Sequence, residues 1–346
     1  MKSILYISYD SILDAISKSQ ITPLIIKYSS KNKVYLVSVE KNFSEAIKYK
    51  KTLKGNVEFK FLKYKKNILF KFLNIFTYQF LILKFIIINK IDIVHVRSYL
   101  PISLLILTKL FKNIKIIFDI RGFWFDEKYE AGLISKGTYY FLKRFEKFFF
   151  KTADIIITLS EVSKEIIIKK FNIKSQKIYV IPTFTNFNNF RSTNKKTNKK
   201  IITFGYIGNL KMNYDFYKVI KFLNIYNKIN KNWNFFIATE YSKKELELMG
   251  NKLLFNKKKI ILKNIKYEKM NSFYSNIDAC IYFLNDKFSK KASCPTKLGE
   301  LIATNTPIIT NPNIGDINKI HKILNLKNFL INEINYPVVK KISRDL

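Results

Sequence analysis

Short apolar runs rich in β-branched residues alternate with helix-length segments along almost the whole chain of 346 residues. This alternation favours right-handed βαβ units and a parallel sheet, because a parallel strand can return to the same sheet only through a long crossover. In the first half, strands are predicted at residues 4–8, 34–39, 57–62, 91–96, 114–120, 154–159 and 178–181. The helical segments between them include residues 20–29, 68–89, 102–111 and 136–150.

The pattern is interrupted at residues 186–200, where polar and charged side chains follow one another without an apolar period, which predicts a linker. Beyond it, strands are predicted at residues 201–207, 235–238, 260–265, 279–284, 307–310 and 329–331. Helices are predicted at residues 215–230, 243–249, 269–275, 296–303 and 317–324. We therefore expect an α/β chain of two doubly wound, Rossmann-like domains, residues 1–185 and 201–346, facing each other across a ligand-binding cleft.

The charge of the chain is strongly positive, with 62 Lys and Arg against 25 Asp and Glu and a net charge of +37. Such a field attracts phosphate groups on a nucleic acid, on lipid head groups or on a nucleotide, and does not choose among the three. An aromatic fraction of 16% excludes a disordered chain. Two cysteines, Cys280 and Cys294, provide no disulfide framework, and with no signal peptide recognised we expect a cytoplasmic protein.

Residues 68–88 are apolar enough to raise the question of a membrane span, but Lys71, Asn74, Gln79 and Lys84 interrupt them. A lysine at membrane depth costs about 3 kcal/mol on insertion scales. A buried or interfacial helix is therefore expected here.

The segment of residues 292–312 has the residue types of a phosphate-binding helix start. Ser293 or Cys294 can cap a helix, and Pro295 suits its first turn because no amide hydrogen is needed there. Free amides at that point suit a diphosphate, Lys297 adds positive charge, and Glu300 can accept hydrogen bonds from two ribose hydroxyls. On spacing alone, an ordinary surface helix explains these residues better.

This segment resembles the donor-binding signature of family 4 glycosyltransferases, which have the GT-B fold. Further segments resemble the family's motifs in the family's order: residues 6–21 its first strand and donor-facing loop, 118–127 a cleft loop, 154–161 and 180–182 the end of its first domain, and 206–210 the opening of its second. Several weak motifs in the right order are together much more specific than any one of them.

The resemblance implies a retaining, hexosyltransferase-like enzyme without a cofactor, which moves a sugar from a nucleotide-sugar to a glycan or lipid-linked glycan in surface polysaccharide synthesis. Its implied catalytic residues are Arg121, Lys297 and Glu300, with Glu300 on the donor ribose. The implied donor contacts are Gly208, Asn209, Lys211, Ser293, Pro295, Thr296, Lys297 and Glu300. The cleft residues expected on the acceptor side are Ser19, Gln20, His95, Trp124, Asp126 and Glu127.

The chain departs from the family pattern in four places. Asn209 and Tyr214 fill the places of a common basic pair, with Lys211 close by, and Ser11 and Ser17 stand in a first loop that is usually rich in glycine. Ala292 stands where the family carries an acidic residue that contacts the sugar. Arg121 stands where many relatives carry a histidine; it cannot act as a base at neutral pH but can stabilise phosphate charge, unless it only pairs with Asp126 or Glu127. No His, Cys and Asp cluster has metal-ligand spacing, so metal-independent chemistry is expected.

Aromatic and basic residues interleave in two helical segments of the first domain, residues 70–85 and 142–150. Such surfaces would rest on anionic lipid, at about 1 kcal/mol for each basic residue, which predicts a peripheral protein at the inner face of the cell membrane. The alternative is that both aromatic stripes belong to the core. The aromatic members are Phe70, Phe72, Phe76, Tyr78, Phe80 and Phe85 in the first segment, and Phe145, Phe148, Phe149 and Phe150 in the second.

Three other functions stay open. A nucleic-acid-binding protein would explain the charge, but no helix-turn-helix, zinc-finger or RNA-recognition signature occurs, so no nucleic-acid partner is expected. An epimerase of the same fold would need further acid–base residues. An inactive or truncated relative is the third, because the chain stops at Leu346 where the family usually continues through helices that return to the first domain.

Overall fold

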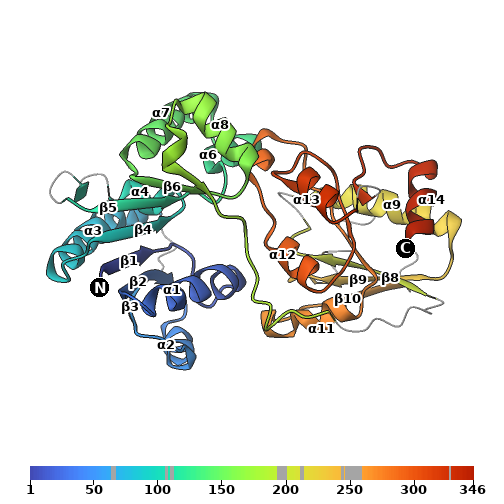
Figure 1. Cartoon of the computed structure of the whole chain (residues 1–346), viewed down its shortest axis with the longest axis horizontal. Coiled ribbons are helices and arrows are strands. Elements are labelled where there is room, and N and C mark those ends of the chain that lie inside the picture. Colours follow the sequence, from blue (N-terminus) through green and yellow to red (C-terminus); the bar gives the residue numbers. More distant parts are fainter. Residues whose placement is uncertain are drawn as a thin grey trace. The chain divides into compact units, whose positions relative to one another are not determined.

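The computed structural model forms two compact units, Met1–Pro182 and Thr183–Leu346, each built on one parallel sheet (Figure 1). The structure describes the whole chain except residues 64–67, 106–107, 110–112, 193–200, 211–213, 243–244, 246–258 and 327–328, and for residues 68–77 it describes the backbone only. Every strand pair within the two sheets is parallel, which confirms the predicted doubly wound α/β architecture.

The sheet of the first unit has seven strands in the order β3-β2-β1-β4-β5-β6-β7. They are β1 (Ser3–Ile7), β2 (Lys33–Glu40), β3 (Val57–Lys63), β4 (Ile93–Arg97), β5 (Lys115–Asp119), β6 (Ile155–Thr158) and β7 (Ile178–Val180). The chain fills one side of β1 first and then crosses to β4 on the other side. The carboxyl ends of β1 and β4 therefore meet at a topological switch point, where doubly wound sheets bind their ligands.

Helices cover both faces of this sheet. They are η1 (Ser17–Ile21), α1 (Thr22–Ser29), α2 (Phe43–Thr52), α3 (Ile68–Ile88), α4 (Tyr99–Ser103), α6 (Trp124–Glu130), α7 (Lys136–Thr152), α8 (Glu161–Phe171) and η2 (Ser175–Lys177). Alternate strand residues point to opposite faces. Val34, Leu36 and the rings of Phe59 and Phe61 pack with α1 and α2, whereas Tyr35 packs edge-on against Phe85 of α3.

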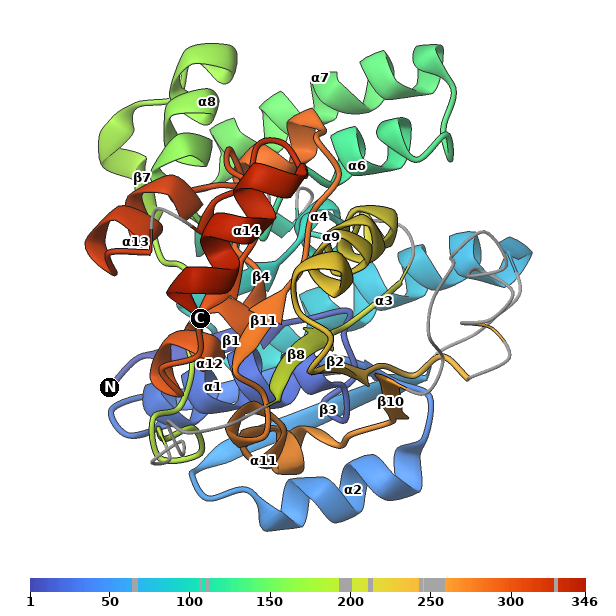
Figure 2. The ribbon, with the colours of Figure 1, turned by 90° about the vertical axis from the view of Figure 1, so that its right-hand side faces the viewer.

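The sheet of the second unit has five strands in the order β10-β9-β8-β11-β12, with its own switch point between β8 and β11. They are β8 (Ile202–Ile207), β9 (Trp233–Ala238), β10 (Ile260–Lys263), β11 (Ala279–Ile281) and β12 (Ile308–Ile309). Around them lie α9 (Phe216–Ile229), η4 (Tyr267–Lys269), α11 (Met270–Ser275), η5 (Phe288–Ala292), α12 (Thr296–Ala303), α13 (Ile317–Ile323) and α14 (Tyr336–Asp345). Figure 2 shows α14 beside α9, on which it packs through Val339 and Ile342, both fully buried.

Some predicted elements differ in the structure. The strand expected at residues 329–331 is a single bridge between Thr310 and Leu330. Helix α6 occupies part of the segment expected to be a loop, because acidic residues in its first turn favour a helix start. Of the helix expected at 102–111, α4 ends at Ser103 and part of the remainder lies outside the described residues, as do most of 243–249 and residues 193–200 of the expected linker. Phe190, from the linker's described part, is buried in the core of the second unit.

The aromatic residues expected on a membrane face divide between core and surface. Phe149 and Phe150 of α7 and Tyr78 of α3 are buried, so for these residues the core alternative is right. Phe80, Phe145 and Phe148 are exposed, and the side chains of Phe70, Phe72 and Phe76 lie outside the described part. Over the described residues, no helix is both long and apolar enough to cross a bilayer.

Candidate active site

In the second unit, helix α12 begins at the carboxyl side of the sheet with its first turn uncapped. Pro295 is its N-cap residue and no side chain bonds to its first amides. The hydroxyl of Thr183 fixes the approach, lying 3.2 Å from the carbonyl oxygen of Pro295 and 3.0 Å from Sγ of Cys294. Ser293 and Thr296 are half-buried beside it. Amides at such a helix start can bind an anion, because they have no intrahelical acceptor and stand at the positive end of the helix dipole.

The ammonium group of Lys297 is buried in a tyrosine cage formed by Tyr206, Tyr214 and Tyr282. Its Nζ lies 4.1 Å from the ring centre of Tyr214 and 4.2 Å from that of Tyr282, and the side chain is only 5% exposed. Nζ donates one hydrogen bond, 2.6 Å long, to the carbonyl oxygen of Ile207 at the end of β8. No described carboxylate forms an ion pair with it. An ammonium has three donors, so this buried cation is suited to an anionic ligand.

Gly208 leaves room beside that ammonium. Its φ of +113° is a left-handed conformation that side chains rarely adopt, and a Cβ there would lie 3.8 Å from Nζ of Lys297. The next residue is fixed by two tyrosines: the Tyr241 hydroxyl donates to Oδ1 of Asn209 at 3.1 Å, and the Tyr206 hydroxyl donates to its carbonyl oxygen. Lys211 lies outside the described residues.

Glu300 follows one turn after Lys297 on α12 and is 7% exposed. The hydroxyl of Tyr274 donates a 2.5 Å hydrogen bond to Oε2 of Glu300. Burial raises the pKa of this carboxyl to about 7, against the opposing effects of the Tyr274 hydrogen bond and the charge of Lys297. Glu300 can therefore change its charge near neutral pH. Ala292, where the resemblance led us to expect an acidic residue, is fully buried.

In the first unit, four charged or polar side chains meet at the carboxyl ends of β4 and β5. Asp119 is at the centre: its carboxylate lies 3.4 Å from Nη1 of Arg121, 3.7 Å from Nη1 of Arg97 and 3.7 Å from Nε2 of His95. We call these four residues the Asp119 cluster. Asp10, which follows β1, extends it through a 3.2 Å contact with Nε of Arg97, so the cluster spans the switch point.

The positive charges around Asp119 favour the ionised form of its carboxyl group. Burial by itself would raise the pKa of Asp119, but Arg121, His95 and Arg97 together outweigh burial, and the pKa lies below its ordinary value. Burial lowers the pKa of Arg121, which Asp119 partly counteracts. The backbone of Arg121 has a φ of +54°, a conformation that costs about 1–3 kcal/mol for a residue with a side chain and that is frequent at functional sites.

The structure brings some of the predicted acceptor-side residues to this cluster and leaves others apart. Oε1 of Gln20 accepts a hydrogen bond from Arg121 at 3.4 Å, and Nδ1 of His95 lies 3.2 Å from the Tyr28 hydroxyl. Ser19 is buried and donates to the carbonyl oxygen of Ile16 within its own turn.

The residues of α6 have other surroundings. Asp126 accepts from Nζ of Lys143 at 2.7 Å and from the Tyr139 hydroxyl at 2.8 Å, so it anchors α6 to α7, while Arg121 pairs with Asp119. Glu127 stands half-buried in the first turn of α6. Trp124 is 39% exposed and stacks on Tyr99.

Arg97, Asp119, Tyr274 and the tyrosine cage were not among the predicted site residues. Arg97 and Asp119 carry a signal that the sequence does contain, because each is a charged residue at the last position of an apolar strand. The tyrosines carry none, since a tyrosine within an apolar segment is indistinguishable from core. No group of three or more His, Cys, Asp or Glu able to hold a metal ion occurs among the residues that the structure describes.

Comparison with known proteins gives a family match over part of the chain and a shared fold. Residues 33–188 match the sequence model described as Glycosyltransferase Family 4, while no curated protein matches the chain. A glycosyltransferase from Rickettsia africae ESF-5 is structurally similar, with a TM-score of 0.64 at 15% identity over 99% of this chain and 97% of that one. The apo form of the lipopolysaccharide outer core galactosyltransferase WaaB is similar with a TM-score of 0.60 and 15% sequence identity, over 99% of this chain and 95% of that chain. Anabaena Alr3699/HepE, in complex with UDP and glucose, is similar with a TM-score of 0.64 and 9% sequence identity, over 100% of this chain and 99% of that chain. UDP-N-acetylglucosamine 2-epimerases share the fold as well.

Proposed function

We propose that this chain, a glycosyltransferase of family 4 with the GT-B fold, transfers a hexosyl group with retention from a nucleoside diphosphate sugar to a glycan or lipid-linked glycan of the cell surface. The observation that carries the donor part of this proposal is the buried Lys297 ammonium, which forms no ion pair with a described carboxylate, beside Gly208 and the uncapped start of α12. Those three features together suit a diphosphate.

Donor binding follows from the chemistry of these groups. The two remaining N–H groups of Lys297 and the first amides of α12, at Thr296 and Lys297, would bind the diphosphate oxygens, with Ser293, Pro295 and Asn209 shaping the surrounding loops. The ionised Glu300 would accept hydrogen bonds from the ribose hydroxyls while Tyr274 holds its carboxylate in place. Since HepE was solved with UDP, a uridine nucleotide is the first donor to test.

Catalysis would depend on electrostatic stabilisation. When the bond between the anomeric carbon and the diphosphate breaks, negative charge grows on the leaving phosphate, and fixed cations stabilise it most where water is excluded. Lys297 is such a cation on the donor side. Arg121 is proposed as a second group of this kind, since it keeps its charge at neutral pH and cannot act as a base. The chemistry proposed here needs neither a metal ion nor a cofactor.

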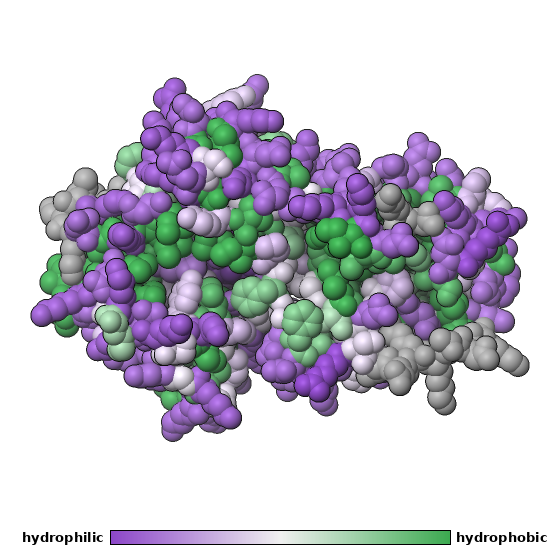
Figure 3. All heavy atoms as spheres, viewed as in Figure 1, coloured by the Kyte–Doolittle hydropathy of each residue, from purple (hydrophilic) through white to green (hydrophobic). Residues whose placement is uncertain are grey.

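The acceptor part of the proposal is supported by an exposed aromatic stripe on α7, formed by Phe141, Phe145 and Phe148. These residues are 60%, 41% and 46% exposed and follow the i, i+4, i+7 spacing of one helix face. Basic residues flank the stripe: Lys136, Arg144, Lys147 and Lys151. Figure 3 shows hydrophilic side chains over much of the visible surface, with apolar side chains gathered in patches. A lipid-linked acceptor at an anionic membrane would explain why this stripe is uncovered.

Thermal shift with UDP-, GDP- and CMP-sugars tests the donor site. We expect one nucleotide class to stabilise the wild type, by about 2.7 kcal/mol at one hundred times the dissociation constant. Glu300→Ala should lose this stabilisation, and Glu333→Ala, an exposed carboxylate of the same unit, should keep it. If none of the sugar nucleotides shifts the melting temperature, the donor site is wrong.

Two further measurements separate the rival functions. Incubation of the stabilising sugar nucleotide without acceptor should release no epimerised sugar, whereas rapid epimerisation would favour an epimerase. Filter binding with salt titration should detect no tight RNA or DNA binding. Anomeric retention in the product is read from its NMR coupling constants.

A further inference from the structure

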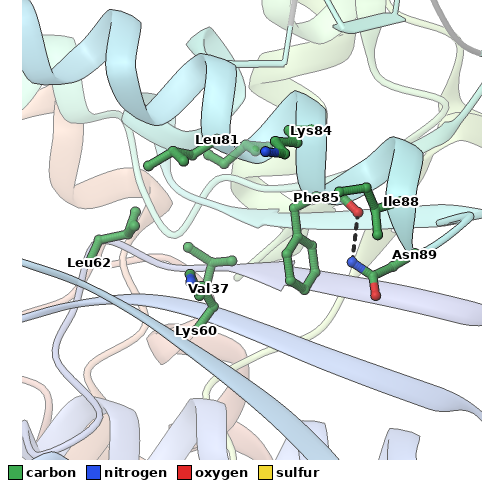
Figure 4. Close-up of a pocket in the computed structure, with 9 residues that line it drawn as sticks. Val37, Lys60, Leu62, Leu81, Lys84, Phe85, Ile88 and Asn89 are labelled. Atoms are coloured by element: carbon green, nitrogen blue, oxygen red, sulfur yellow. Dashed lines mark hydrogen bonds between the residues drawn. The ribbon is translucent and has the colours of Figure 1, made fainter.

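A pocket of about 280 Å³ lies in the first unit between helix α3 and strands β2 and β3 (Figure 4). Val37 and Leu62 line it from the strands, and Leu81, Phe85 and Ile88 line it from the helix. Figure 4 shows the Phe85 ring pointing from α3 toward the strands. The volume is just below the range of about 300–1,000 Å³ that ligand pockets span, so it suits one short segment of a molecule.

The side chains of β3 and α3 leave part of each other's apolar surface uncovered at the pocket. On β3, Lys60 takes a position on the same face as Leu62, where a strand beneath a helix usually carries an apolar residue. On α3, Leu81 and Ile88 stay 39% and 65% exposed although they line the pocket. An apolar chain packed against these walls would gain dispersion contacts along the lining.

The charge around the pocket is of one sign. Among the described residues that line it, Lys60 and Lys84 are the charged ones; both are exposed, and neither forms an ion pair with a described residue. The amide of Asn89 is occupied by its hydrogen bond to the carbonyl oxygen of Phe85, 2.9 Å long. The ligand that matches this lining has an apolar chain and an anionic group, and the apolar walls do not suit a nucleotide or a free sugar.

We propose that this pocket binds the apolar chain of a phosphate-bearing lipid acceptor, with Lys60 and Lys84 attracting its phosphate. The acceptor role rests on the proposed function, whereas the binding itself does not. The pocket differs from the α7 stripe in what it binds. The pocket would hold the apolar chain of one lipid molecule, whereas the stripe would lie on the membrane surface. It gives the acceptor a second point of attachment besides its glycan.

Isothermal titration of the full chain with dodecyl phosphate, below its micelle concentration, tests the proposal. We expect one binding site. Decyl maltoside, which lacks the charge, and inorganic phosphate, which lacks the chain, should each bind at least tenfold more weakly. Leu81→Trp, which fills the pocket from a partly exposed position, should weaken dodecyl phosphate binding at least tenfold, and Lys84→Glu should weaken it severalfold.

Matched controls lie on α2, which covers the opposite face of the sheet. Ile47→Trp and Lys48→Glu make the same changes at exposed positions there and should bind dodecyl phosphate as the wild type does. Should Leu81→Trp lower the melting temperature, Ile88→Trp, at a more exposed position of the same wall, replaces it. Unchanged affinity in the pocket variants, or inorganic phosphate binding as tightly as dodecyl phosphate, would overturn the proposal.

The outcome is separable from that of the proposed function. The pocket variants are also assayed for sugar-nucleotide stabilisation, which should be unchanged because the donor residues belong to the second unit. Loss of dodecyl phosphate specificity with donor stabilisation intact refutes the pocket alone. Pocket-dependent binding without any donor stabilisation refutes the donor site and leaves a lipid-binding site.

Discussion

At the scale of single residues, the carboxyl group of Glu300 is close to half ionised at neutral pH. Its pKa is raised to about 7 by burial, and the ionised form accepts hydrogen bonds from two ribose hydroxyls much more strongly than the protonated form does. The diphosphate diester of a sugar nucleotide keeps its charge between pH 6 and 8. We therefore predict that donor affinity, measured by isothermal titration, rises about tenfold over this range, and that Glu300→Gln abolishes the pH dependence.

The same group should affect stability in the opposite direction. The folded pKa lies above the ordinary value of 4.5, so the folded state binds the proton more tightly than the unfolded state does. Stability contributed by Glu300 is complete below pH 4.5 and falls as the pH rises to about 7, by about 3 kcal/mol at most.

Tyr274→Phe removes a hydrogen bond that lowers the pKa of Glu300, so it should move the pH midpoint of donor binding upward. A midpoint that stays the same or moves downward would contradict this account.

At the scale of elements, α7 presents two aromatic faces with different roles. Phe150 is fully buried, whereas Phe141, Phe145 and Phe148 are exposed. The triple change of the exposed residues to Ser should weaken binding to phosphatidylglycerol vesicles about 10- to 100-fold in a sedimentation assay, because each ring would otherwise enter the lipid interface. The melting temperature should stay close to that of the wild type.

The matched control on α7 is the buried ring. Phe150→Ala should lower the free energy of unfolding by about 3–5 kcal/mol, because it opens a cavity in the core. Vesicle binding of the folded fraction should be unaffected. Equal vesicle binding by the triple variant and the wild type would mean that the stripe has another partner.

Most elements of the chain could be predicted from local patterns. The α12 helix has its predicted bounds, Thr296–Ala303, with Pro295 as its N-cap. Its buried apolar side is formed by Leu298 and Leu301, whereas Ile302, which the helical spacing also placed on that side, is 37% exposed. Helix α6 was not predicted, because part of what holds it is tertiary: Asp126 is fixed by Lys143 and Tyr139 of α7. The bridge at Thr310 likewise depends on a neighbouring strand more than on its own residues.

The candidate site could be predicted only in part. Gly208, Lys297 and Glu300 stand in short segments with recognisable spacing. The Asp119 cluster could not be deduced, since it depends on β1, β4 and β5 being neighbours, and strand order is a property of the whole sheet. The tyrosine cage joins residues from β8 and from the segments around Tyr214 and Tyr282, whose proximity no local pattern encodes.

At the scale of the whole molecule, the net charge of +37 should govern how the protein meets a membrane. Binding to phosphatidylglycerol vesicles should weaken steeply between 0.05 and 0.5 M salt, since the Debye length is about 8 Å at 0.15 M and shorter above it. Binding to uncharged phosphatidylcholine vesicles should be weak throughout. If salt has no effect on the anionic vesicles, electrostatic attraction is not the driving force.

The crossover between β1 and β4 also sets a timetable for folding. Ile4 pairs with Ile93, so at about 5–20 residues per second a ribosome needs roughly 5–20 s after making β1 to deliver its inner partner. Throughout that interval one edge of β1 is open to pairing with other chains. His95 and Arg97 are made with β4, and Asp119 follows with β5, so the Asp119 cluster forms only after this delay. The strand order that brings these residues together therefore also leaves an unpaired strand edge in the nascent chain, where another chain can pair with it.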